Sequence, residues 1–349
     1  MPSEQKAIRE IAARLAELLG LDQSRIRIEA GRSAPHIDGV IVAGSFTFLI
    51  EWKGSGHAAQ VASAIEQVQR HAAEVDGAVP LVAVPFMGST GRERCAEADL
   101  AWLDLSGNAR IFAPGLRILV EGKPNRFKRR GRPSSAFAPK SSRITRWLLM
   151  HPHESLTQRE IARVTATDEG YTSRIVSKLE QDGLIVRAKG GAIKPRDPDL
   201  LLDAWREDYD FTKHHIIKGH VAARSGDELL KELSGALEKT SVEFAATGLA
   251  AAWLLDRFAG FRTTTLYLAD NPSTALLDAV SFREEERGAN VWLVVPNDEG
   301  VFHGASLVEG IRCVHPVQVY LDLEAHPERA DEAARSLRAA RLNWSANAR

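Results

Sequence analysis

Residues 156–185, LTQREIARVTATDEGYTSRIVSKLEQDGLI, decide the fold of the middle of this chain. Thr157 is followed three residues later by Glu160, a capping box that predicts the start of a helix. A short turn leads to a longer helical pattern that ends at Gly183, a residue typical of the position just after a helix. Two helices joined by a tight turn predict a helix-turn-helix unit.

The longer helical pattern has a buried side and an outward side. Thr172, Ile175, Val176 and Leu179 recur at the spacing of one helix face, which predicts a buried stripe. The opposite side and the amino end combine an aromatic ring, small hydroxyls and cations, groups that suit base edges and phosphates in a major groove. These candidate DNA-binding residues are Tyr171, Ser173, Arg174, Ser177 and Lys178, beside Gly170.

A preceding helical pattern, SSRITRWLLMHP, and a following strand pair, LIVRAKGGAIKPRD, complete a winged helix over residues 141–197. The strand pair places Arg187, Lys189 and Lys194 for phosphate contacts. The motifs T-x-x-E-I-A and Y-x-S-R-I-V-x-x-L-E-x-D-G-L-I resemble those of MarR-like winged helix-turn-helix modules of prokaryotic regulators. This resemblance implies sequence-specific binding to double-stranded DNA. The alternative is a winged helix that binds protein.

Charge is distributed unevenly along the chain. The formal net charge is -1, yet residues 123–197 contain 17 Lys and Arg against 7 Asp and Glu. A basic middle between acidic flanks indicates that one segment meets a polyanion. Residues 123–140 lack a helical or strand period, which predicts a basic arm along a DNA backbone or, alternatively, a solvated linker. The clustered cations of this arm are Arg126, Lys128, Arg129, Arg130 and Arg132.

Residues 1–122 predict a compact α/β domain with a candidate metal site. In the strand FTFLIEWK the side chains alternate between two faces, so Glu51 and Lys53 share a face. A tight turn at Gly44 returns the strand of Asp38 beside Glu51. Two converging carboxylates suit a hard divalent cation such as Mg²⁺. A lysine beside them can orient or deprotonate a water.

The order helix, hairpin, helix and strand around D-x12-E-x-K resembles the αβββαβ core of the PD-(D/E)xK nuclease superfamily. The resemblance implies a restriction-endonuclease-like domain with Asp38, Glu51 and Lys53 as catalytic residues and Asp38 and Glu51 as Mg²⁺ ligands. Gln67 and Gln69 fall where many members place a supporting glutamine. Two alternatives remain: a domain kept for binding without cleavage, and a solvated Glu51–Lys53 pair on an edge strand.

Residues 198–349 predict a second α/β domain, because strands such as TTTLYLA and NVWLVVP alternate with helical patterns. The segments TGLAAAWLLDRFAGFRTTTLYLA and HPVQVYLDLEAHPERADEAARSLR resemble the C-terminal domain of AbiEi-type antitoxins of type IV toxin–antitoxin systems. The resemblance implies a regulator with a toxin partner. His214 and His215 are interpreted as part of a polar face rather than metal ligands. Asp322 and Glu324 are expected on a solvated edge.

Composition agrees with a multidomain α/β protein. The 349 residues allow two to three domains, and 44% hydrophobic with 26% charged residues is typical of globular chains. No run of about 18 apolar residues predicts a membrane span. Two widely separated cysteines fit a reducing cytoplasm. We therefore expect a double-stranded DNA-binding transcriptional regulator of a defence or toxin–antitoxin locus, acting as a homodimer on two half-sites. The alternative is a Mg²⁺-dependent DNA endonuclease that the winged helix directs to its site.

Overall fold

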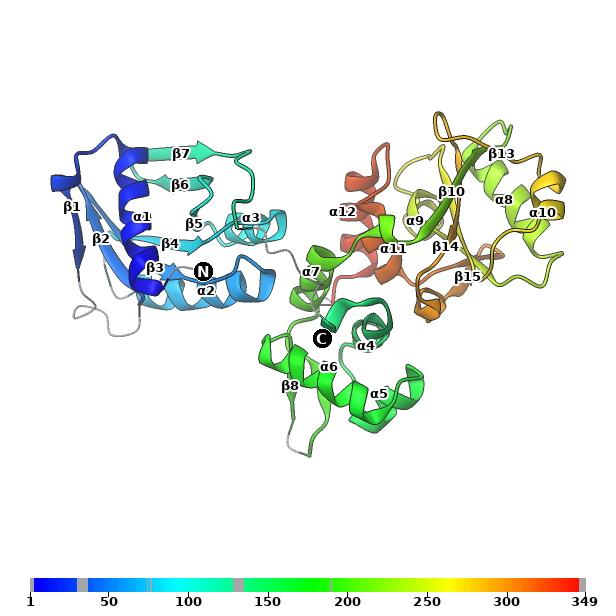
Figure 1. Cartoon of the computed structure of the whole chain (residues 1–349), viewed down its shortest axis with the longest axis horizontal. Helices are drawn as coiled ribbons and strands as arrows, with labels where there is room; N and C mark the ends of the chain where they lie inside the picture. The colour runs from blue at the N-terminus through cyan, green and yellow to red at the C-terminus, as the bar shows by residue number, and fades with distance from the viewer. Residues whose placement is uncertain are drawn as a thin grey trace. The chain divides into compact units, whose positions relative to one another are not determined.

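A computed structural model divides the chain into two compact units, residues 1–132 and 133–349. Both units are mixed α/β, with twelve α-helices within the described residues (Figure 1). Within those same residues, no helix is long and apolar enough to cross a membrane. The structure describes residues 3–29, 37–73, 75, 77–127, 135–188 and 190–344. The predicted DNA contacts that lie outside these ranges are Lys128, Arg129, Arg130, Arg132 and Lys189.

The first unit is built around a seven-stranded sheet whose strands follow one another in chain order. Its elements are α1 (Glu4–Leu19), η1 (Gln23–Arg25), β1 (Ile26–Glu29), β2 (Gly39–Ala43), β3 (Phe46–Trp52), α2 (Ala58–Ala72), β4 (Val79–Val84), α3 (Ser89–Glu97), β5 (Ala101–Asp104), β6 (Ala109–Ala113) and β7 (Leu116–Val120).

Helices cover both faces of this sheet. Strands β3, β4 and β5 pair in parallel, and the other neighbours pair antiparallel. Phe48 and Ile50 of β3 face the core beneath α1, whereas Leu49 faces the core beneath α2 and α3 (Figure 1). The predicted alternation of this strand is therefore confirmed. The order α1-β1-β2-β3-α2-β4 is the expected αβββαβ order, while the restriction-endonuclease-like assignment stays a prediction.

The second unit begins with the winged helix. Its elements are η2 (Ser135–Phe137), α4 (Pro139–Met150), α5 (Gln158–Val164), α6 (Glu169–Gln181), β8 (Ile185–Arg187) and β9 (Ile193–Pro195). Strands β8 and β9 pair antiparallel, and a bridge from Leu156 to Ile193 adds a third short rung. Because α4 starts at Pro139, Lys140 lies in a helix and not in the irregular segment predicted over residues 123–140.

The remainder of the second unit is an α/β region with a mixed seven-stranded sheet in the order β13-β10-β14-β12-β11-β16-β15. Helix α4 packs against α5 and α6 and also against α7, η4 and α11, so the winged helix and the α/β region share this helix. The elements are α7 (Pro198–Asp208), η3 (Phe211–Lys213), β10 (His215–His220), α8 (Gly226–Leu237), β11 (Phe244–Thr247), α9 (Gly248–Asp256), β12 (Thr264–Leu268), α10 (Thr274–Ala279), β13 (Arg283–Glu284), β14 (Val291–Val295), η4 (Glu299–Phe302), β15 (Ser306–Val308), β16 (Ile311–Cys313), α11 (Pro316–Leu323) and α12 (Ala330–Arg341).

Candidate nucleic-acid interface and metal site

The hairpin of β2 and β3 brings Asp38 beside Glu51. Gly39 pairs with Ile50, so Asp38 and Glu51 stand opposite each other one step further along the ladder. Directly opposed residues of an antiparallel pair have Cα atoms about 4.5–5.5 Å apart. Asp38 Oδ2 also accepts a hydrogen bond of 2.9 Å from the Trp52 amide, which fixes this carboxylate at the end of β3.

Lys53 joins Glu51 to helix α2. Its Nζ donates to Glu51 Oε1 at 2.6 Å and to Gln67 Oε1 of α2 at 2.7 Å. Of the two glutamines singled out in the sequence, Gln67 therefore reaches Lys53, whereas Gln69 lies on the exposed side of α2. Glu51 is 2% exposed and β3 lies inside the sheet, so the interpretation as a solvated pair on an edge strand is wrong.

The electrostatics of Glu51 favour a further positive group. Burial raises the pKa of the Glu51 carboxyl, and the charge of Asp38 raises it further against the opposing hydrogen bond from Lys53. Glu51 Oε2 is buried and has no hydrogen-bond partner within the described residues. An unsatisfied carboxylate oxygen beside a second carboxylate fits a Mg²⁺ ligand, with waters completing the coordination.

Among the residues that the structure describes, no three or more His, Cys, Asp or Glu side chains form a cluster able to bind a metal. Asp38 and Glu51 are the two opposed carboxylates of this site, and their role as metal ligands stays a prediction.

Helix α6 has the predicted buried stripe. Thr172, Ile175, Val176 and Leu179 are its buried residues. The helix ends in a Schellman motif, in which the Leu184 and Gly183 amides donate to the carbonyls of Leu179 and Glu180. Of the predicted outward residues, Arg174 is exposed. The partly buried ones are Tyr171, Ser173, Ser177 and Lys178.

Several predicted DNA-binding cations already pair with carboxylates. Lys178 Nζ lies 2.7 Å from Asp182 on α6, and Arg187 Nε lies 2.8 Å from Glu180 Oε2. Such partly exposed pairs contribute little to stability, so both cations remain available to a stronger anion. Lys194 of β9 is exposed on the wing.

Tyr171 lies at the contact between α4 and α6. Its hydroxyl shares a hydrogen bond of 2.6 Å with the hydroxyl of Ser141, a residue that is 1% exposed. Lys140 Nζ and Arg174 Cζ each lie 5.4 Å from the centroid of its ring. Lys140 and Ser141 lie outside the motifs of residues 156–185 and were not among the predicted DNA contacts. A basic residue in the first turn of the preceding helix is the signal that points to Lys140.

The α/β region contains a buried polar cluster centred on Asp322, whose predicted place on a solvated edge is wrong. Asp322 is 0% exposed and accepts hydrogen bonds from Tyr209, Tyr267, Thr247 and Gln318. Burial raises the pKa of Asp322 to about 6, although these hydrogen bonds lower it in part. Four donors satisfy the carboxylate in place of solvent, which is the condition for burying such a group.

The predicted polar face is confirmed for His215, whereas His214 is buried. His214 is buried, hydrogen-bonded through Nε2 to the Tyr209 hydroxyl at 3.0 Å, and accepts the Asn297 amide at Nδ1. His215 is exposed on β10, as a polar strand face requires. Burial lowers the pKa of His214 to about 4, and the charge of Arg146 adds to this effect.

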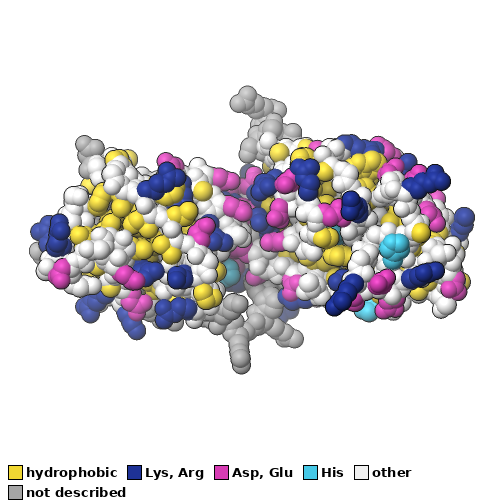
Figure 2. All heavy atoms as spheres, turned by 90° about the horizontal axis from the view of Figure 1, so that it is seen from above, with side chains coloured by type: hydrophobic (Ala, Val, Ile, Leu, Met, Phe, Trp, Pro, Cys, Tyr) yellow, Lys and Arg dark blue, Asp and Glu magenta, His cyan; other side chains and the backbone are white. Residues whose placement is uncertain are grey.

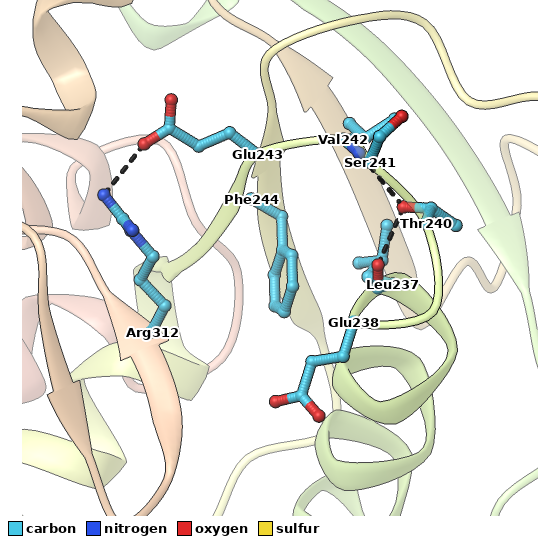
Figure 3. A pocket seen from close by; sticks show the side chains of 8 residues that line it. All are labelled: Leu237, Glu238, Thr240, Ser241, Val242, Glu243, Phe244 and Arg312. Atoms are coloured by element: carbon cyan, nitrogen blue, oxygen red, sulfur yellow. Dashed lines mark hydrogen bonds and ion pairs between the residues drawn. The ribbon is translucent and has the colours of Figure 1, made fainter.

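An open pocket lies near the start of β11, away from these clusters (Figure 3). Glu243 and Arg312 point toward each other there and form an ion pair of 2.8 Å. The Thr240 hydroxyl donates to the Leu237 carbonyl and accepts from the Val242 amide. Glu243, Arg312 and the Thr240 hydroxyl therefore find their partners within the pocket lining itself.

Two family models match this chain. Residues 195–342 match the family described as transcriptional regulator, AbiEi antitoxin, type IV TA system. Residues 140–192 match the MarR family. No curated protein and no solved structure matches significantly. The MarR-like winged helix and the AbiEi-like C-terminal region are therefore confirmed, and residues 1–139 lie outside both matches.

Proposed function

We propose that this protein is a double-stranded DNA-binding transcriptional regulator of a type IV toxin–antitoxin or related defence locus. The observation that carries the proposal is the outward face of α6, where exposed Arg174 stands among hydroxyl groups over a fully buried stripe. The two family matches support the regulatory role.

In this proposal α6 enters the major groove and the wing follows the adjacent backbone. Arg174, Ser173 and Ser177 read base edges, for which guanidinium and hydroxyl groups provide suitable donors. Lys194 and Arg187 of the wing contact phosphates, which position the protein without reading sequence. The basic arm and Lys189, outside the described residues, add further phosphate contacts.

The partners of the proposal are DNA, a second copy of the chain and a toxin protein. Two half-sites one helical turn apart require two recognition helices, so we propose a homodimer. The toxin partner rests on the AbiEi match alone.

Fluorescence anisotropy with the DNA upstream of the protein's own gene tests the proposal. Arg174→Ala should weaken binding to the specific site by about 1–3 kcal/mol if Arg174 contacts a base edge. Arg224→Ala, which removes an exposed arginine of the α/β region, is the control and should bind like the parent. Equal affinity of the Arg174 variant and the parent at fixed salt would exclude α6 from the interface.

A second candidate function, Mg²⁺-dependent DNA cleavage, is favoured by the unsatisfied Glu51 Oε2 atom next to Asp38. In this proposal Asp38 and Glu51 hold the cation, which supplies charge stabilisation at the attacked phosphate. Lys53, held by Gln67, orients or deprotonates the attacking water. The αβββαβ element order supports this reading.

Thermal melting with and without Mn²⁺ or Mg²⁺, together with plasmid cleavage, tests the second candidate. Metal should raise the melting temperature of the parent, because a ligand that binds only the folded state stabilises it. Asp38→Asn should abolish this rise and any cleavage without changing DNA binding by the winged helix. Glu97→Gln on the exposed surface of α3 is the control. A parent protein that gains no stability and leaves plasmid intact has no active metal site.

A further inference from the structure

The Tyr171 ring is held in place from two sides at the amino end of α6. Its backbone amide donates to Asp168 Oδ1 at 2.7 Å, within the N-cap of the helix. Its hydroxyl is bonded to Ser141 of α4, which is buried. The hydroxyl is therefore engaged within the protein, which argues against Tyr171 as a base-reading residue.

Two cations from different helices gather at this fixed ring. Lys140 lies in the first turn of α4 and Arg174 on the outward face of α6, and both are exposed. Because each cationic group is 5.4 Å from the ring centroid, the two groups lie within about 11 Å of each other. Successive phosphates of one strand advance about 3.4 Å along the duplex axis, so a separation of this size corresponds to a short stretch of backbone.

The surroundings of these cations differ from those of neighbouring basic residues. Arg159, Lys178 and Arg187 each pair with a carboxylate, at 3.2, 2.7 and 2.8 Å. Within the described residues, neither Lys140 nor Arg174 has an acidic partner, and each contacts the Tyr171 ring. Figure 2 shows positive and negative side chains interspersed on the face it draws.

We infer that Lys140, positioned beside Arg174 by the Tyr171 ring, binds the phosphate backbone of DNA next to the groove that α6 enters. The inference rests on the proposed DNA binding and refines it. Lys140 becomes a contact from α4, and Tyr171 becomes a positioning residue that holds both cations. Two positive charges near one ring repel each other, and a phosphate bound at Lys140 reduces this repulsion. The ring supplies part of the compensation while the site is free.

Anisotropy titrations of the full-length protein over a range of salt, on specific and random duplexes, test the site. Lys140→Gln should make the negative slope of log K against log salt shallower by about 0.9, the value for one phosphate contact. The ratio of specific to random affinity should stay unchanged, because a phosphate carries no sequence information. Lys194→Gln on the wing provides a comparison for a phosphate contact without an aromatic support.

Tyr171→Leu tests the positioning role, because it removes the ring while retaining both cations. The salt slope should become shallower, as it does in Lys140→Gln. The double variant Lys140→Gln/Tyr171→Leu should lose less affinity than the sum of the two single losses, because both substitutions remove the same contact. Tyr171→Phe, which keeps the ring and removes the bond to Ser141, should retain most of the slope and serves as the check on folding.

The outcomes distinguish a failure of the proposed DNA binding from a failure of the phosphate site alone. A parent that binds no DNA overturns both the proposed function and this site. A parent that binds, with an unchanged salt slope in Lys140→Gln and in Tyr171→Leu, overturns the phosphate site alone. A specific loss on one duplex but not on random DNA would make Lys140 a sequence-reading residue and would also overturn the inference.

Discussion

Two buried carboxylates of this protein differ in how they are hydrogen-bonded. Asp322 and Glu51 are both carboxylates with exposures of 0% and 2%, yet their surroundings differ. Asp322 receives four hydrogen bonds, whereas one oxygen of Glu51 has no partner in the described residues. The first arrangement stabilises a fixed structure, and the second leaves a position that a cation can fill.

Asp322 should make the stability of the protein depend on pH. Burial raises its pKa from 3.8 in the unfolded chain to about 6 in the folded protein. Between these values the folded state holds the proton more tightly, so this carboxyl favours folding at low pH and loses that contribution as pH rises through 6. Compared with Asp322→Asn, the parent should lose about 2 kcal/mol of unfolding free energy between pH 4 and pH 7.

Denaturant unfolding of both proteins at each pH measures this difference. Any constant effect of the substitution cancels, because only the change with pH is compared. A parallel pH dependence in the two proteins would mean that Asp322 titrates at its ordinary value.

Among the elements, α5 and α6 owe their ends to signals in their own sequence. Thr157 and Glu160 form both hydrogen bonds of the predicted capping box. Gly183, at φ 72°, adopts the left-handed conformation that lets α6 end and β8 begin. The first signal therefore sets where α5 begins, and the second sets where α6 ends.

Two glycines of this helix should respond oppositely to alanine. Gly183→Ala should destabilise the protein by about 1–2 kcal/mol, because a Cβ atom is strained at positive φ. Gly170→Ala should be neutral or slightly stabilising, since Gly170 lies within α6 at ordinary φ and its Cβ would meet nothing closer than 3.5 Å. Thermal and urea unfolding compare the two variants, and equal effects would contradict the assigned end of α6.

Across the second unit, α4 connects the winged helix with the α/β region. Arg143 of α4 forms a bidentate pair with Asp298, at 2.8 and 2.7 Å, and both side chains are 11% exposed. Buried Arg146 donates to Gln318, which in turn donates to Asp322. Helix α4 therefore joins the Tyr171 contact to the buried cluster of the α/β region.

A double-mutant cycle measures how strongly this connection holds the unit together. Arg143→Ala and Asp298→Ala should show a coupling of about 1–3 kcal/mol in unfolding free energy, as expected for a well-formed, largely buried pair. The exposed pair Arg159–Glu169, with side chains 86% and 63% exposed, is the matched control and should couple by less than about 1 kcal/mol. Similar coupling in both pairs would show that α4 is not anchored through Arg143.

The sequence by itself determined the features that depend on neighbouring residues. The capping box, the end of α6 at Gly183 and its buried stripe follow from short-range spacing. The opposition of Asp38 and Glu51 follows from one tight turn, because a two-residue connection leaves a single register for the hairpin.

Only the tertiary structure decided the burial of Asp322, the anchoring of Tyr171 by Ser141 and the pairing of Arg143 with Asp298. Apart from Gln318, a neighbour of Asp322 on α11, their partners lie far away in the chain, 155 positions apart for the arginine pair. From a sequence pattern a charged side chain is predicted to be exposed, because burying it without partners is unfavourable. Such a residue is buried only when distant segments supply the hydrogen bonds or opposite charge, and folding alone brings those segments together.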